Sequence, residues 1–336
     1  VYSSGTSGAP VGVPFTLEYL DARALLADRY WVRAEPFMAL MGMNGVVGLL
    51  TAHRSVAAGA TYLCRGTEEH NLAVALRARV AALKGSPVQL SVFARALATS
   101  GFSLDSLRWI VSAGAPTSHV LEAELRALTG ARFVRSYAST EAGPVAIQET
   151  PGADPWDAGR IVDDVEIEIV GDGGQLLAAG GEGEIRLRRR GMPTAYHGEA
   201  ASRRELLRDG WFHPGDLGAI TSDRRLLLSG RATDVVNAGG VKIDPARVDD
   251  ALRSLGSPYD LATFGFITVH GITGLGLAIT CPPDTDLTPF IDTVRTASTG
   301  YTLDVVRLVD AIPLTATGKV DRGALARAME ADQRQR

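Results

Sequence analysis

The sequence is poor in cysteine, carries no strong net charge and has no long apolar run. Its 336 residues include two cysteines, Cys64 and Cys281, which lie far apart and form no CxxC pattern. With no signal peptide either, the sequence predicts a protein of the reducing cytoplasm. The formal net charge of -4 gives no broad electrostatic attraction for nucleic acid, so binding to nucleic acid is not expected.

No stretch of the sequence predicts a membrane span. The longest uncharged run covers residues 36–51, which is shorter than the roughly 20 apolar residues that a membrane helix needs. Glycines interrupt this run, so we interpret it as a buried helix or a packed turn. The six histidines show no spacing typical of metal ligands, and we assign structural roles to most of them.

The chain has a globular composition and a regular alternation of helical and extended segments. Hydrophobic residues make up 46% and charged residues 21%, and the length predicts two or three domains. Helices are predicted over 72–83 and 120–128, the second with Ser118 as its cap. A buried strand is predicted over 109–112, ended by a turn at 113–116. This alternation indicates a layered α/β domain.

From about residue 160 the pattern changes to short strands with tight turns. Apolar and charged residues alternate over 165–170 and 184–189, and a turn is predicted at 171–174. This pattern predicts a β-rich subdomain. The arginines at 188–190 can be interpreted as an anion-binding patch or as a solvated strand end, and the second is favoured.

A separate domain is expected to begin near residue 230. The sequence predicts a helix over 245–255, begun by its proline, and strands near 262–269 and 276–280. The polar tail over 329–336 is expected to be frayed.

Five short motifs carry candidate chemistry, and the first is rich in small and hydroxyl residues. Residues 2–8 read YSSGTSG. Closely spaced Gly, Ser and Thr let backbone N–H groups and hydroxyls converge on an anion such as a triphosphate. In isolation, a flexible loop is the favoured interpretation of such a stretch. It is not a Walker loop, because no GK[ST] follows at the right spacing.

The second and third motifs each place a carboxylate beside an aromatic or stiff neighbour. Residues 136–141 read SYASTE, in which an aromatic ring, a hydroxyl and Glu141 could stack a base, contact a phosphate and hold Mg²⁺. Alone, Glu141 could equally be a helix-start charge. Residues 210–217 read GWFHPGDL, where Asp216 follows a Pro-Gly turn and could accept hydrogen bonds from both ribose hydroxyls. A turn with an aspartate cap explains this motif equally well.

The fourth and fifth motifs lie in the expected second domain. Residues 230–234 read GRATD and are followed by NAGGVK at 237–242. Residues 313–320 read PLTATGKV, in which Lys319 follows a tight Thr-Gly turn that could deliver its ammonium group to a site. An isolated exposed lysine is usually only solvated, so this motif is also ambiguous by itself.

Taken in this order, the five motifs resemble those of the adenylate-forming superfamily, which includes acyl-CoA synthetases, adenylation domains of nonribosomal peptide synthetases and luciferases. The resemblance covers essentially the whole chain. It implies an α/β fold, with a layered main AMP-binding domain and its β-rich subdomain over 1–229 and a small mobile α+β domain over 230–336. Members carry a long N-terminal stretch before the phosphate loop, whereas this chain opens at Val1. Residues 1–229 are therefore expected to be the C-terminal part of the main domain.

The resemblance also implies a role for each motif. Lys319 would bridge the acyl carboxylate and the α-phosphate side of ATP, and its charge would stabilise the transition state. Thr140 would contact phosphate, Glu141 would be the Mg²⁺ ligand, and Tyr137 would stack on adenine. Further nucleotide-binding residues are expected in three groups: the phosphate loop (Ser3, Ser4, Gly5, Thr6, Ser7, Gly8), the adenine pocket (Gly114, Ala115, Pro116) and the ribose site (Asp216, Arg231).

The sequence departs from the superfamily pattern at four places. Val11 stands where a lysine is usual, which removes a cation near the outgoing pyrophosphate, so weaker ATP binding or slower adenylation is expected. The segment 36–38 lacks a histidine that many acyl-CoA synthetases carry. Ala138 replaces a common glycine. Thr233 and Asp234 stand at the hinge, and which of them would pivot is left open.

The activity that the resemblance implies is a ligation in two steps. ATP and a small-molecule carboxylic acid would give acyl-AMP and pyrophosphate, and the acyl group would then pass to coenzyme A or to the phosphopantetheine of a carrier protein. The stretch at 237–242 favours acyl-CoA synthetase relatives. The alternative is a degenerate, non-catalytic member that binds nucleotide or a carrier protein, which Val11 favours and the retained Lys319 opposes. The methionine-rich run 38–43 is compatible with an apolar acyl group and equally with core packing.

Overall fold

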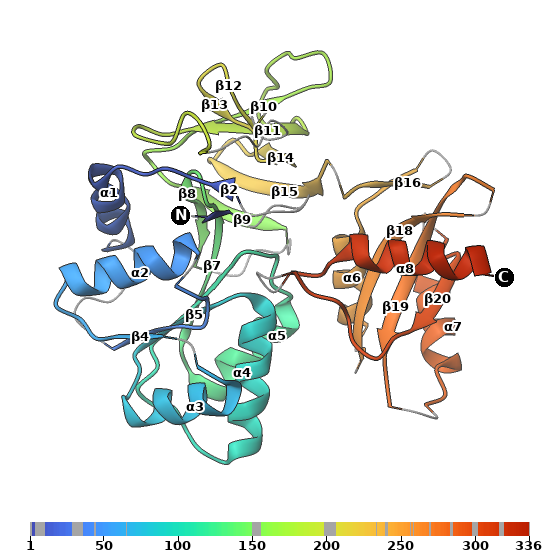
Figure 1. The fold of residues 1–336 in the computed structure, drawn as a ribbon, viewed down its shortest axis with the longest axis horizontal. Coiled ribbons are helices and arrows are strands. Elements are labelled where there is room, and N and C mark those ends of the chain that lie inside the picture. Colours follow the sequence, from blue (N-terminus) through green and yellow to red (C-terminus); the bar gives the residue numbers. More distant parts are fainter. Residues whose placement is uncertain are drawn as a thin grey trace. The chain divides into compact units, whose positions relative to one another are not determined.

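The computed structural model describes residues 2–3, 11–28, 36–43, 45–64, 66–149, 156–197, 206–232, 234–238, 241–255, 257, 259–268, 270–282, 285–297, 302–315 and 319–335. The chain divides into two compact units, Val1–Leu228 and Ser229–Arg336 (Figure 1). The predicted α/β fold, with a layered main unit, a β-rich part and a smaller α+β unit, is confirmed. Mobility of the smaller unit stays a prediction.

A 13-stranded sheet forms the backbone of the first unit. One half is parallel, with neighbouring strands in the order β4 (Tyr62–Cys64), β3 (Phe37–Ala39), β5 (Ala82–Gly85), β6 (Trp109–Ala113) and β7 (Arg132–Ser139). The carboxyl ends of parallel strands meet at one edge, which is where open α/β sheets usually bind ligands. The turns after β6 and β7 carry two of the predicted motifs.

Helices cover the two faces of the parallel half. On one face lie α3 (Glu68–Arg77), α4 (Pro87–Ser100) and α5 (His119–Thr129), while α1 (Leu17–Asp28) and α2 (Val46–Ala57) lie on the other (Figure 1). Leucines and alanines of α3–α5 form one core with Met38, Leu83, Ile110 and Phe133 of the strands. Alternating strand residues therefore face the α3–α5 core or the α1–α2 side.

Local signals explain where these helices begin and end. Ser86 and Gln89 form a capping box at the start of α4, which ends at Gly101 with a left-handed φ of 70°. The predicted cap of α5 is confirmed, because Ser118 accepts a hydrogen bond from the Leu121 amide.

The antiparallel half of the sheet continues from β7 and contains the β-rich part. It comprises β8 (Gly143–Gln148), β9 (Asp157–Ile161), β15 (Arg225–Arg231), β14 (Asp216–Ile220), β11 (Gly183–Arg188), β13 (Trp211–Phe212) and β12 (Leu207–Arg208), with β10 (Glu166–Val170) paired to β11. Strands β10 and β11 confirm the two predicted alternating segments, and Ile169 faces Ile185 in the second core. Two short strands, β1 (Tyr2–Ser3) and β2 (Val11–Gly12), form a separate pair.

The second unit is a three-stranded sheet between helices. Strands β18 (Asp260–Ile267) and β19 (Thr273–Thr280) are antiparallel, and β20 (Val305–Leu308) runs parallel to β19. Helices α6 (Pro245–Ser254) and α7 (Thr288–Ala297) contribute to one core and α8 (Arg322–Gln335) to another. A two-stranded pair, β16 (Val236–Ala238) and β17 (Val241–Ile243), precedes α6.

Three segment predictions are wrong. The helix predicted over 72–83 ends at Arg77, because Arg79 turns the chain with φ 51° and residues 82–85 join the sheet as β5. The run 36–51 holds strand β3 and the start of α2 rather than one element. The tail expected to fray is helical to Gln335.

The tail is helical because it has tertiary partners. Leu325 is 4% exposed in the core beneath α8. Farther along, Glu330 accepts a hydrogen bond from the Ile267 amide at 3.0 Å. Asp332 pairs with Arg307 at 2.7 Å.

Candidate nucleotide and acyl-transfer site

Thr140 and Glu141 lie in the tight turn that joins β7 to β8. The Ala142 amide donates to the Ser139 hydroxyl at 3.0 Å and closes the turn. The Glu141 side chain is buried, with 6% of the residue exposed, and it begins no helix, so that alternative interpretation is wrong. Gly143 has φ 74°, a left-handed conformation that favours glycine, and it lies against the Arg23 guanidinium.

The backbone of this turn is held by three buried side chains from other elements. The Tyr19 hydroxyl of α1 lies 3.1 Å from the Glu141 carbonyl oxygen, and Arg23 Nη1 donates to that of Thr140 at 3.4 Å. Arg189 donates to the Ala142 carbonyl at 2.5 Å and to Asp164 at 2.9 Å. Arg189 is 7% exposed, so the interpretation of 188–190 as a solvated strand end is wrong at that residue.

Tyr196 is a site residue that the sequence interpretation missed. Its hydroxyl donates to Oε1 of Glu141 at 2.9 Å. The next residue, His197, donates its amide to the Gly12 carbonyl at 2.7 Å, which ties this segment to the strand after the phosphate loop. Because 55 residues separate Tyr196 from Glu141, no local pattern could have indicated this contact.

Two predicted nucleotide residues from different motifs meet directly. The Tyr137 hydroxyl of β7 donates to Oδ2 of Asp216 at 2.5 Å. Asp216 is the first residue of β14 and is 8% exposed. It follows Gly215, whose φ of 74° shapes the preceding turn. An aromatic ring and a carboxylate are thus placed side by side, as a stacked base and its ribose require.

The predicted adenine-pocket residues follow β6 at the same edge of the sheet. Gly114 adopts φ 93°, and a Cβ there would lie 3.5 Å from Cε of Met41, which follows β3. Ala115 and Pro116 are exposed. Since β6 pairs with β7 up to Ala113 and Ser136, this turn and the SYASTE motif are neighbours.

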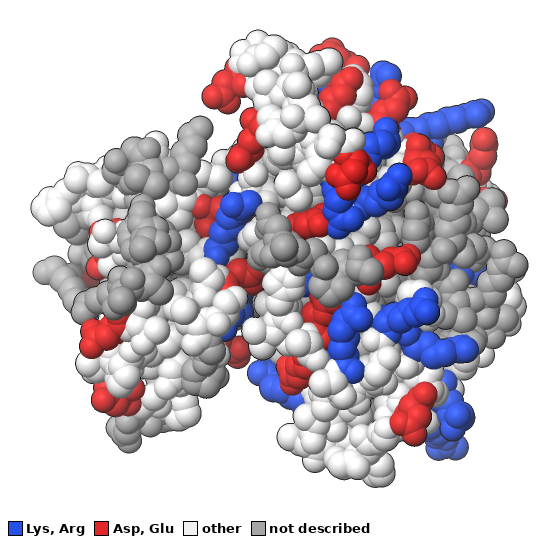
Figure 2. Space-filling model, turned by 180° about the vertical axis from the view of Figure 1, so that it is seen from behind, with Lys and Arg blue, Asp and Glu red and all other residues white. Residues whose placement is uncertain are grey.

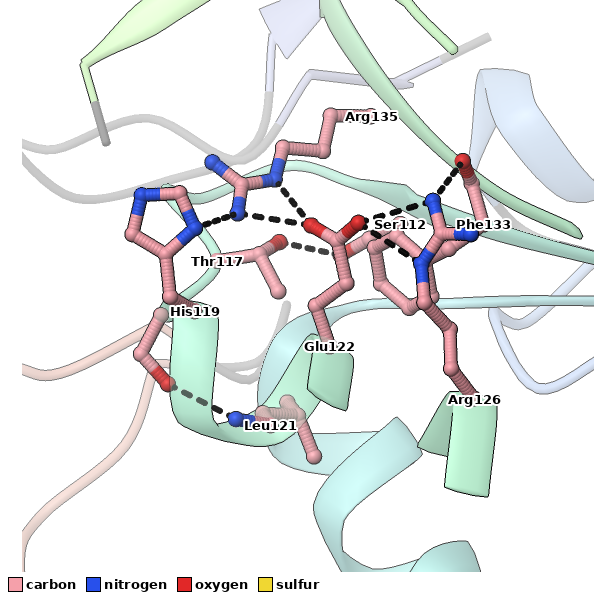
Figure 3. Close-up of polar contacts among 9 residues, drawn as sticks. Ser112, Thr117, His119, Leu121, Glu122, Arg126, Phe133 and Arg135 are labelled. Atoms are coloured by element: carbon pink, nitrogen blue, oxygen red, sulfur yellow. Dashed lines mark hydrogen bonds and ion pairs between the residues drawn. The ribbon is translucent and has the colours of Figure 1, made fainter. Parts of the chain in front are cut away.

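A buried ion-pair network holds α5 against β7 beneath these turns (Figure 3). Glu122, 4% exposed, accepts from Arg126 at 2.9 Å and from Arg135 at 2.9 and 2.7 Å. Arg135 also lies 3.0 Å from Nδ1 of His119. Because arginine only donates, that nitrogen is the acceptor and the proton of a neutral ring is on Nε2. Ser112 and Thr117 share a hydrogen bond of 2.6 Å across the adenine-pocket turn.

In the second unit, Lys319 is exposed, and its backbone is hydrogen-bonded to Thr315. The Thr315 amide donates to the Lys319 carbonyl at 2.7 Å, and the Lys319 amide donates to the Thr315 hydroxyl at 3.2 Å. Immediately afterwards, Arg322 donates to the Thr263 carbonyl at 2.9 Å and pairs with buried Asp249. The backbone that carries the lysine is therefore tied to the core of its unit.

The remaining predicted residues are placed only in part. Arg231 ends β15, and its carbonyl accepts from the amide of Asp234 at 3.1 Å. Ser3 pairs with Val11 in the β1–β2 ladder. Ser4, Gly5, Thr6, Ser7, Gly8 and the hinge candidate Thr233 lie outside the described residues.

The residues of the β7–β8 turn fit a magnesium ion shared with phosphates. Within the described ranges, no group of three or more His, Cys, Asp or Glu side chains could hold a metal. Mg²⁺ commonly takes one or two protein oxygens and completes its shell with phosphate and water. A buried carboxylate at Glu141 and a hydroxyl at Thr140, held in one turn, are the donors that such a site needs.

Charged side chains of both signs lie on the face shown in Figure 2, where the acidic and basic side chains of the described residues are interspersed. Among the described helices, none is long and apolar enough to cross a membrane.

Comparison with known proteins identifies related sequences along the chain. A family model described as AMP-binding enzyme matches residues 1–197. Naringenin synthase of Pestalotiopsis fici is 32% identical over 247 residues, which cover 70% of this chain and 9% of that protein. Feruloyl-CoA synthase of Amycolatopsis sp is 26% identical over 353 residues, or 97% of this chain and 69% of the relative. Indoleacetate–CoA ligase of Aromatoleum aromaticum is 26% identical over 284 residues, which cover 79% of this chain and 53% of that protein.

Solved structures share the fold. An anthranilate CoA ligase in complex with anthranoyl-AMP superposes with a TM-score of 0.83 at 23% identity, covering 98% of this chain and 67% of that one. O-succinylbenzoate coenzyme A synthetase from Bacillus subtilis, in complex with ATP and magnesium ion, gives a TM-score of 0.82 at 22% identity, with coverage of 96% and 68%.

Proposed function

Because the chain belongs to the AMP-binding enzyme family, within the adenylate-forming superfamily, we propose that it activates a carboxylic acid with ATP and passes the acyl group to a thiol. The observation that carries the proposal is the buried β7–β8 turn, which holds Thr140 and Glu141 next to the Tyr137–Asp216 pair. The named CoA ligases and synthases among the relatives support coenzyme A as the acceptor. A carrier-protein phosphopantetheine is the second candidate acceptor.

In the first step, a carboxylate oxygen of the acid attacks the α-phosphorus of ATP. The bond from that phosphorus to the bridging oxygen breaks, and pyrophosphate leaves with the bonding electrons. Such a reaction depends on positioning and on neutralisation of charge. Thr140 binds phosphate, the Tyr137 ring stacks on the base, and Asp216 accepts from the ribose hydroxyls with Arg231 assisting. The residues of the phosphate loop, Ser3–Gly8, bind the outer phosphates, and the turn Gly114–Pro116 lines the adenine pocket.

Mg²⁺ bound at Glu141 would supply positive charge to the phosphate oxygens. The Tyr196 hydroxyl orients the Glu141 carboxylate through its 2.9 Å hydrogen bond. Lys319 supplies a cation to the acyl carboxylate and the α-phosphate. Val11 stands in place of the usual loop lysine, so neutralisation of the phosphate charge falls to Mg²⁺ and Lys319.

In the second step, the sulfur of the thiol attacks the acyl carbon and AMP leaves. The thiol proton goes to solvent or to the departing AMP. Rotation of the second unit, residues 229–336, between the two steps would withdraw Lys319 and admit the thiol.

Pyrophosphate release dependent on a carboxylic acid tests the proposal. The purified protein is incubated with ATP, Mg²⁺ and a panel of aromatic and aliphatic acids. Lys319→Ala is expected to abolish the acid-dependent signal, whereas Arg327→Ala, in the same unit with a 72% exposed side chain, is expected to leave it unchanged. Absence of release with every acid, together with retained ATP binding, would favour the non-catalytic nucleotide binder that Val11 suggests.

A further inference from the structure

The aspartate that we assign to the ribose follows an interruption in an antiparallel ladder. Phe212 of β13 is opposite Leu187 of β11, and Leu217 of β14 is opposite Glu184. Strand β10 occupies the other edge of β11 at both positions, so β13 and β14 lie along one edge. The chain advances by five residues there while β11 advances by three. The two extra residues form a bulge, which we define as residues 213–215.

The sequence of the bulge suits a change in strand direction. A β-bulge bends its strand and re-aims the side chains beside it. Pro214 fixes its own φ, and Gly215 adopts a left-handed φ of 74°. Asp216 follows at once, and its carboxylate meets the Tyr137 hydroxyl. Because a bulge lacks regular ladder hydrogen bonds, other contacts must fix the direction in which Asp216 points.

His213 joins the bulge to two neighbouring strands. The residue is 6% exposed, and its amide donates to the Leu206 carbonyl at 2.7 Å. Its Nδ1 lies 3.2 Å from Oε1 of Glu184 on β11 and 3.1 Å from Nη2 of Arg208 on β12. With the proton on Nδ1 the ring donates to Glu184, and with the proton on Nε2 it accepts from Arg208. Either tautomer ties the bulge to an adjacent strand.

The ring is the buried member of this cluster. The His213 side chain is 7% exposed, against 37% for Glu184 and 46% for Arg208. Burial and then the charge of Arg208 lower the pKa of His213 from its ordinary 6.5, with Glu184 opposing the shift and Arg186 adding to it. The ring is therefore neutral at pH 7, and it can influence the nucleotide site only through the position of the chain.

We propose that His213 is a positioning residue for nucleotide binding: it holds the bulge against β11 and β12 and so aims the Asp216 carboxylate at the ribose hydroxyls. His213 acts through Asp216 rather than by contact with the nucleotide. This inference rests on the proposed binding of ATP at Asp216.

Nucleotides that lack one ribose hydroxyl test this role. Calorimetry with Mg²⁺ and without acid measures the affinities for ATP, 2′-deoxy-ATP and 3′-deoxy-ATP. The unmodified protein is expected to bind ATP roughly tenfold more tightly than at least one deoxynucleotide, because a hydrogen bond to a carboxylate is lost. His213→Leu fills the buried position without a polar atom and is expected to reduce that preference by roughly threefold or more. His213→Asn places an amide near the position of Nδ1 and is expected to restore much of the preference.

Two further variants serve as a control and as a second test. His53→Leu removes a histidine that pairs with Asp21 at 2.7 Å between α2 and α1, and it is expected to keep the preference for ATP. The double variant Glu184→Ala, Arg208→Ala leaves the ring in place but removes both of its side-chain partners. Because these two side chains are partly exposed, the double variant also covers the case in which His213→Leu does not fold, and it is expected to show the same reduced preference.

Equal weakening of ATP and deoxynucleotide binding in His213→Leu would overturn the inference, because that result is expected of a merely structural residue. An unchanged preference in the double variant would also overturn it. Equal affinities of the unmodified protein for all three nucleotides, or no binding of ATP, would overturn both this inference and the ribose role of Asp216.

Acid-dependent pyrophosphate release by the same unmodified protein decides the proposed activity separately. If no acid releases pyrophosphate although ATP binds, the proposed activity fails, and the ratio of nucleotide affinities still decides the role of His213.

Discussion

Replacement of Glu122 by glutamine should destabilise the first unit strongly. Glu122 is 4% exposed and is the carboxylate partner of Arg135, itself 7% exposed (Figure 3). Glutamine keeps the shape of the side chain but removes the negative charge, so the buried guanidinium loses the carboxylate that pairs with it at 2.7 Å. Removal of one partner of a buried ion pair costs about 3–5 kcal/mol. We expect Glu122→Gln to lower the free energy of unfolding by about 3 kcal/mol, the lower end of that range.

Tryptophan fluorescence during urea unfolding measures the free energy of unfolding of the first unit. All four tryptophans, Trp31, Trp109, Trp156 and Trp211, lie within residues 1–228, so the signal reports the first unit. The shift of the transition midpoint, multiplied by the slope, gives the loss of free energy.

Arg126→Gln is the matched comparison, because Arg126 is the more exposed partner of the same carboxylate. Its side chain is 34% exposed, and an ion pair of that kind contributes at most about 1 kcal/mol. Equal losses in the two variants, or a loss below about 1 kcal/mol for Glu122→Gln, would refute the assignment of this network as a buried, charge-compensated pair.

Three further predictions concern the turn, a histidine and the second unit. Tyr196→Phe should raise the Mg²⁺ concentration for half-maximal pyrophosphate release by roughly tenfold, because Glu141 loses a donor; an unchanged magnesium dependence would contradict this role. Burial and then Arg208 lower the pKa of His213, so the folded state binds its proton less readily than the unfolded state. The free energy of unfolding should therefore fall as pH drops through the ordinary pKa of 6.5. The His213→Gln variant should lose less of this free energy on acidification than the unmodified protein. The same dependence of stability on pH in both proteins would count against this role of His213. Asp249→Asn should destabilise the second unit by about 3 kcal/mol, since buried Asp249 compensates Arg322; hydrogen exchange of the β18 amides measures it, and unaltered protection would argue against this pair.

Sequence interpretation succeeded where the signal is local. The cap at Ser118, the helix that begins at Pro245 and the alternating strands at 166–170 and 183–188 each depend on residues a few positions apart. Where two structures suit the same local residues, it failed. Alanine and leucine after Arg77 fit a helix, but their burial in the sheet favoured a strand.

The sequence by itself determined the family and the order of the motifs, and it predicted roles for Tyr137, Glu141 and Asp216, because residue type and spacing carry that information. Tertiary structure alone decided which of them touch. The Tyr137–Asp216 contact spans 79 residues and the Tyr196–Glu141 contact 55. Such contacts depend on how the sheet and its helices pack, and no short stretch of chain encodes them.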